Sequence, residues 1–167
     1  MRIDWIENYL NEAEKLIYDN RVNEGIALMQ NLLYEEPGYG YLHNHLGWAY
    51  MYYTPNVALA ELHLKMAIRS DGEYAAPFVH LGNLMIRCNR YAEAIEYLQR
   101  GLQKPSANRV SFLEALGQAW ELSGDFPKAI KAYREAMMAS LIDQEVTNLN
   151  NHVARCRKKR WASFWRV

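Results

Sequence analysis

The segment Asn108–Met138, NRVSFLEALGQAWELSGDFPKAIKAYREAMM, contains the pattern that decides the fold. Its first half centres on Leu116–Gly117 and spaces its apolar residues as one face of a helix. Gly124–Phe126 follows, with the glycine and aspartate typical of a turn. One face of the second half carries small and aromatic residues, namely Ala129, Tyr133 and Ala136. The segment therefore predicts two consecutive helices joined by a short turn.

The Leu-Gly pair of this segment recurs earlier in the chain, at Leu46–Gly47 and Leu81–Gly82. Gly47, Gly82 and Gly117 are each 35 residues apart. The pattern Leu-Gly-x-x-aromatic, followed by Ala-x-x-x-Tyr-x-x-Ala, resembles the tetratricopeptide (TPR) repeat, whose period is about 34 residues. The resemblance extends over residues 4–140, with a degenerate first copy.

This resemblance implies an all-α fold, a right-handed TPR superhelical solenoid of four antiparallel helix pairs followed by a C-terminal capping helix. The expected repeats span residues 4–37, 39–72, 73–105 and 106–140, and the capping helix with its basic and aromatic tail spans residues 143–167. Small residues such as Gly117 let paired helices approach, and rings such as Tyr133 fill the space between them. Each pair buries its apolar face only against the next, so we expect one TPR domain over residues 1–167.

The composition suits a folded domain of this kind. Half of the 167 residues are hydrophobic and 23% are charged, which is enough apolar material for a buried core. The net charge of +0 argues against a globally basic nucleic-acid binder or a membrane-surface protein. No stretch approaches the roughly 18 apolar residues of a membrane span, and the N-terminus has no apolar run of signal-peptide length. We therefore expect a cytoplasmic protein.

Residues that could carry chemistry form no recognisable catalytic or metal-binding pattern. His43 and His45 are two positions apart on a predicted helix, so they point to different faces and do not chelate as an i, i+4 pair would. Cys88 and Cys156 have neither ligand spacing nor a disulfide framework. The sequence has no glycine-rich phosphate loop and no nucleophile signature. We expect a non-enzymatic protein with no cofactor and no metal site.

In TPR proteins the first helix of each pair lines a concave surface, so the resemblance implies a peptide-binding groove there. Helical phase assigns to this groove Tyr41, Asn44, Trp48, Tyr52, His80, Asn83, Arg87, Glu114 and Gln118, with Glu121 on the same face. Asn44, Asn83 and Gln118 can both donate and accept hydrogen bonds, which suits an extended peptide backbone. Trp48 and Tyr52 would anchor apolar side chains, whereas packing of Trp48 within the array is the alternative.

Charge is unevenly distributed along the chain. Residues 1–36 hold eight acidic and three basic residues, a net of −5, whereas residues 152–167 hold six basic residues and no acidic one. The predicted C-terminal contact patch combines these cations with aromatic rings: Arg155, Arg157, Lys158, Lys159, Arg160, Trp161, Phe164 and Trp165. Three interpretations stay open. The patch is a solvated helix end, a contact with an acidic protein or another copy, or a contact with anionic lipid or nucleic acid.

Together these features predict a protein-interaction module, an adaptor, scaffold or chaperone-like protein, that holds a peptide segment of a partner protein in its groove. The alternative is a self-assembling or regulatory protein that uses the C-terminal contact patch. A protein or peptide is the expected partner, and a homo-oligomer is the open alternative. Nucleic acid and an anionic membrane surface are disfavoured, because so short a basic cluster supplies only weak affinity.

Overall fold

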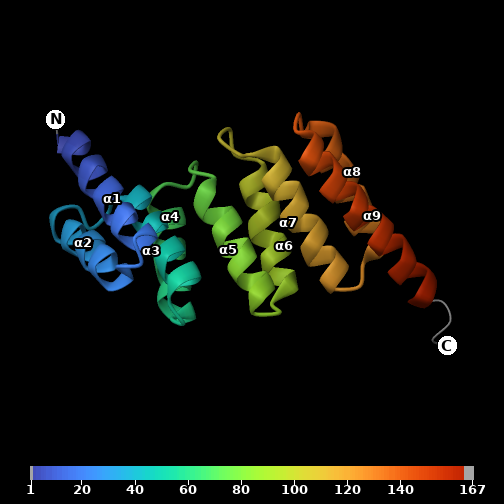
Figure 1. The fold of residues 1–167 in the computed structure, drawn as a ribbon, viewed down its shortest axis with the longest axis horizontal. Coiled ribbons are helices and arrows are strands. Elements are labelled where there is room, and N and C mark those ends of the chain that lie inside the picture. Colours follow the sequence, from blue (N-terminus) through green and yellow to red (C-terminus); the bar gives the residue numbers. More distant parts are fainter. Residues whose placement is uncertain (1, 164–167) are drawn as a thin grey trace. The chain divides into compact units, whose positions relative to one another are not determined.

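The computed structural model describes residues 2–163, with side chains from Trp5 onward, and in this part of the chain it forms nine helices and no strand (Figure 1). The predicted all-α class is confirmed. The helices are α1 (Arg2–Tyr18), α2 (Val22–Glu35), α3 (Gly40–Tyr53), α4 (Val57–Ser70), α5 (Ala76–Arg87), α6 (Tyr91–Leu102), α7 (Arg109–Leu122), α8 (Phe126–Ala139) and α9 (Asp143–Ser163). They fold as two compact units, one ending at His80 and the other beginning at Leu81. The single domain over residues 1–167 stays a prediction.

The first unit is built on close packing between paired helices. α1 packs on α2 and α3 packs on α4, and α3 also contacts α1 and α2. A Cβ atom added to Gly47 would lie 2.6 Å from the Cγ atom of Leu64, closer than carbon atoms approach in proteins. Glycine at this position therefore lets α3 and α4 approach over the fully buried Leu46 and Leu64.

A pair of buried histidines joins α3 to α4. His43 Nδ1 lies 3.0 Å from His63 Nδ1, and His43 Nε2 lies 2.9 Å from the Pro37 carbonyl oxygen. Because a carbonyl oxygen only accepts, neutral His43 donates through Nε2 and accepts at Nδ1 from the N–H of His63. Burial, together with the neighbouring His43, lowers the pKa of His63 to about 4. His45 faces Glu14 instead, so the two histidines occupy different faces as predicted.

The second unit repeats the same packing. A Cβ atom on Gly117 would lie 2.6 Å from the ring of Tyr133, and one on Gly82 would lie 2.5 Å from Leu98. Tyr133 is fully buried between α7 and α8. The predicted close approach at Gly117 and the filling role of Tyr133 are therefore confirmed.

Helix α9 covers α8, with which it shares an extensive contact. Leu149, Val153 and Cys156 lie on one face of α9 and are all buried. The predicted capping helix is confirmed, since these apolar side chains need the surface of the last helix pair to leave water.

Candidate functional site

A stripe of aromatic rings follows one face of α3. Tyr41, His45, Trp48 and Tyr52 occur at i, i+4, i+7 and i+11, so their side chains project from the same side of the helix. Tyr41 is 39% exposed and Tyr52 is 52% exposed, whereas Trp48 is half-buried. Ring centroids are 4.4 Å apart for Tyr41 and His45 and 6.5 Å apart for Trp48 and Tyr52. We call these four residues the α3 stripe.

Further rings extend the α3 stripe at both ends. Tyr18, at the end of α1, lies 5.9 Å from Trp48, and Tyr53 lies 5.2 Å from the same indole. At the other end, Tyr74 lies 5.8 Å from Tyr41. Trp48 thus packs among tyrosines while part of its surface stays open, which combines the two interpretations considered for it. A partly open cluster of rings offers a large contact area at low entropic cost.

Carboxylates border the α3 stripe. Nδ1 of His45 donates a hydrogen bond to the carboxylate of Glu14 on α1. Burial lowers the pKa of His45, and the negative charge of Glu14 opposes this shift. Burial also raises the pKa of Tyr41, and Glu14 and Glu7 raise it further. The surface therefore combines aromatic faces with negative charge, an environment that favours cationic side chains.

Asn44 does not have the open position predicted for it. The residue is only 3% exposed. Its Nδ2 donates to the Tyr74 hydroxyl at 3.2 Å, and its Oδ1 accepts from His80 Nδ1 at 3.0 Å. Burial, with the charge of His45, lowers the pKa of His80 to about 4. Asn44 and His80 therefore hold the beginning of α5 against α3. Asn44 was predicted to bind a peptide backbone directly, but its side chain is used in this structural contact instead.

The other predicted groove residues belong to the second unit. Asn83 on α5 is half-buried, and Arg87 is exposed. On α7, Gln118 is exposed, and Glu114 lies 3.9 Å from His152 of α9. The structure brings together the predicted residues of the first unit, and a single groove that joins them to those of the second unit stays a prediction.

Glu121 does not lie open on the groove face as predicted. Its side chain is buried, at 5% exposure, beneath α9. Arg155 donates to both of its oxygens at 2.7 Å, Lys159 donates at 2.8 Å and the Tyr133 hydroxyl donates at 3.0 Å. Burial alone would raise the pKa of Glu121, but these hydrogen bonds lower it to about 2. Glu121 is therefore a buried anion that ties α9 to α7.

Two residues of the predicted C-terminal contact patch therefore stabilise the fold. Arg155 and Lys159 are one helical turn apart and both bind Glu121, so they are not available as free cations. Arg157, Lys158, Arg160 and Trp161 are exposed. Phe164 and Trp165 lie outside the described residues.

No three potential metal ligands cluster within residues 2–163. Cys88 and Cys156 are both free thiols, and burial raises the pKa of the Cys156 thiol to about 12. None of the described helices is long and apolar enough to cross a membrane.

Comparison with known proteins places the fold. No protein-family model matches this chain, and no curated protein matches its sequence. The structure is similar to PilF of Pseudomonas aeruginosa, with a TM-score of 0.84 and 15% identity over 96% of this chain and 71% of that chain. MamA gives a TM-score of 0.68 and 21% identity over 90% of this chain and 92% of that chain. The TPR protein TTC0263 of Thermus thermophilus gives a TM-score of 0.73 and 19% identity over 90% of this chain and 80% of that chain.

The chain has the tetratricopeptide-repeat fold, as its repeated Leu-Gly pattern predicts. In this fold, stacked helix pairs present extended surfaces for binding other proteins.

Proposed function

We propose that this chain is a non-enzymatic adaptor, scaffold or chaperone-like protein that binds a peptide segment of a partner protein on the α3 stripe. The observation that carries the proposal is the row of rings from Tyr41 to Tyr52 on one face of α3, partly open to solvent. Apolar side chains of the peptide would pack on Trp48 and Tyr52, since the residues that contribute most to binding energy in protein interfaces are enriched in tryptophan and tyrosine.

The charges beside the rings refine the kind of peptide. Glu14 lies against His45, and the negative charges of Glu7 and Glu14 reach Tyr41. A lysine or arginine side chain placed there would gain both cation–π and charge interactions. The proposed ligand is therefore a segment that combines an apolar residue with a basic one.

A comparison of partner capture by variants tests this function. Tyr52→Ala removes the most exposed ring of the α3 stripe, and Tyr9→Ala removes a tyrosine of similar exposure, 45%, on α1 as a matched control. A partner retained by the wild type and by Tyr9→Ala, but lost with Tyr52→Ala and Trp48→Ala, would support the proposal. Equal retention by all four proteins would remove the α3 stripe from the mechanism.

A second candidate function uses the C-terminal contact patch. The observation that favours it is that Arg157, Lys158 and Arg160 remain exposed while Arg155 and Lys159 are held by Glu121. These cations would contact an acidic partner or another copy of the chain. Truncation before Arg155 is a poor test, because it strips a buried carboxylate of its partners. Charge reversal with Arg157→Glu/Lys158→Glu leaves Glu121 paired, and unchanged partner capture in that variant would argue against this candidate.

For both candidate functions, we predict a cytoplasmic location, as expected from the sequence.

A further inference from the structure

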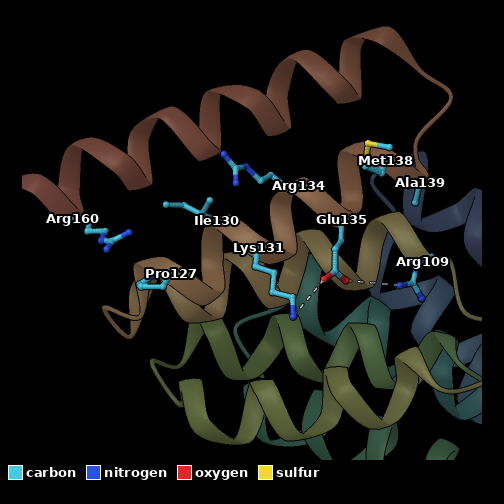
Figure 2. A pocket seen from close by; sticks show the side chains of 9 residues that line it. All are labelled: Arg109, Pro127, Ile130, Lys131, Arg134, Glu135, Met138, Ala139 and Arg160. Carbon is cyan, nitrogen blue, oxygen red and sulfur yellow. Dashed lines mark ion pairs between the residues drawn. The ribbon is translucent and has the colours of Figure 1, made fainter.

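A groove lies beside α8 in the second unit, with α9 along one side (Figure 2). Its volume is about 760 Å³, within the range of binding sites for small ligands and side chains. Pro127 and Arg160 lie at one end, and Met138 and Ala139 lie at the other. The intervening part of α8 is about 18 Å long. A groove of this length accommodates several residues of a bound segment.

The lining of the groove is strongly cationic. Four basic side chains, Arg109, Lys131, Arg134 and Arg160, face a single acidic one, Glu135. Glu135 lies 3.8 Å from Arg109 and 4.0 Å from Lys131, so one carboxylate is shared by two cations. Arg134 and Arg160 form no ion pair with any described residue. The groove thus carries a net charge of +3 and favours an acidic ligand.

Apolar surface accompanies these cations. Ile130 lines the groove, and Met138 at the end of the groove is 88% exposed. The flexible thioether of an exposed methionine adapts well to an aromatic ring. The matching ligand therefore carries carboxylates next to an apolar or aromatic side chain.

The chain itself contains such a segment at its acidic end. Residues 1–36 have a net charge of −5. At the end of α2, Tyr34 is 87% exposed, and the neighbouring Glu35 is also exposed. An open ring beside an open carboxylate complements both the thioether of Met138 and the guanidinium of Arg134.

We infer that the groove beside α8 binds the end of α2 from a second copy of this chain, with Tyr34 against Met138 and Glu35 toward Arg134 and Arg160. Such a contact joins two different surfaces, so one copy of a pair keeps an unused groove and the other keeps an unused α2 end. Association of this type continues head to tail unless it closes into a ring. It uses other residues than the α3 stripe and goes beyond the peptide-binding function.

Sedimentation equilibrium of the full chain at low ionic strength tests this inference. The wild type should self-associate, and association should weaken in about 1 M salt, where charges are screened within about 3 Å. Arg134→Glu/Arg160→Glu and Tyr34→Ser/Glu35→Lys should each weaken association at least about tenfold. Lys65→Glu/Arg69→Glu is the matched control, since it makes the same charge change on exposed cations of α4, outside the groove. It should associate within about twofold of the wild type.

The decisive experiment mixes the two impaired variants, Arg134→Glu/Arg160→Glu and Tyr34→Ser/Glu35→Lys. One variant keeps an intact groove and the other keeps an intact α2 end, so an equimolar mixture should form 1:1 dimers and no larger species. A monomeric wild type, a groove variant that associates normally, a mixture that stays monomeric or a control impaired to the same degree would each overturn the inference. A monomeric wild type whose groove captures an acidic segment of another protein would identify a different occupant. Trp48→Ala should self-associate normally, which separates this test from that of peptide binding.

Discussion

Glu121 on α7 and Arg155 on α9 are 34 residues apart in sequence and joined by two hydrogen bonds of 2.7 Å each. The carboxylate is buried, whereas the guanidinium remains partly open to solvent. Lys159 and Tyr133 complete the set of donors around Glu121. This pairing fixes the last helix and determines which basic residues of the C-terminal contact patch remain free.

Replacing Glu121 by glutamine should destabilise the protein. The variant keeps the shape of the side chain but loses the charge that Arg155 and Lys159 bind, and hydrogen bonds to charged groups are worth about 1.5–3 kcal/mol. We expect the free energy of unfolding in urea to fall by about 2 kcal/mol. Glu114→Gln is the control, because its carboxylate only approaches His152 at 3.9 Å. Equal stability of Glu121→Gln and the wild type would contradict the anchoring role.

Gly117→Ala should also be destabilising. The new methyl group would meet the buried ring of Tyr133 at 2.6 Å, and overpacking of this kind typically costs about 1–3 kcal/mol. Gly38→Ala is a matched control, because nothing lies within 4 Å of its added Cβ atom. Thermal unfolding should show a lower midpoint for Gly117→Ala alone. A midpoint equal to that of Gly38→Ala would show that α7 and α8 separate without cost.

Stability should decrease as the pH falls below about 6.5. His63 and His80 have folded-state pKa values of about 4, whereas the ordinary pKa of histidine is 6.5. Between these values the unfolded chain binds more protons than the folded one, so acidification favours unfolding. Glu121, with its pKa lowered to about 2 from 4.5, adds a further loss only at lower pH.

Urea denaturation at about pH 7 and about pH 5 measures this dependence. His63→Gln should reduce the difference in unfolding free energy between the two conditions, because one of the groups with a lowered pKa is then absent. An unchanged pH dependence in His63→Gln would show that the buried histidine pair does not contribute to it.

The local features of the fold could be predicted from the sequence. Gly117 and Tyr133 lie 16 positions apart in one repeat, and their contact follows from the repeat pattern alone. The buried face of α9, with Leu149, Val153 and Cys156, follows from helical spacing.

Contacts between distant segments could not be predicted in the same way. The pairing of Glu121 with Arg155 depends on how α9 packs beside α7. The position of a residue around its own helix does not reveal this packing. The pairing of Glu14 with His45 depends on the packing of α1 against α3. Asn44 lies roughly 60° around the helix from Tyr41, enough to turn it from the open stripe toward Tyr74 and His80.

The most direct test of peptide binding on α3 is site-specific photo-crosslinking in source cells. A photoreactive aromatic amino acid is placed at Tyr52, on the α3 stripe, or at Tyr9, a tyrosine of similar exposure on α1. The proposed function predicts a discrete crosslinked partner at position 52 that is absent at position 9 and is lost when Trp48→Ala is added. Crosslinks of equal yield at both positions, or crosslinks at position 52 that persist with Trp48→Ala, would contradict it.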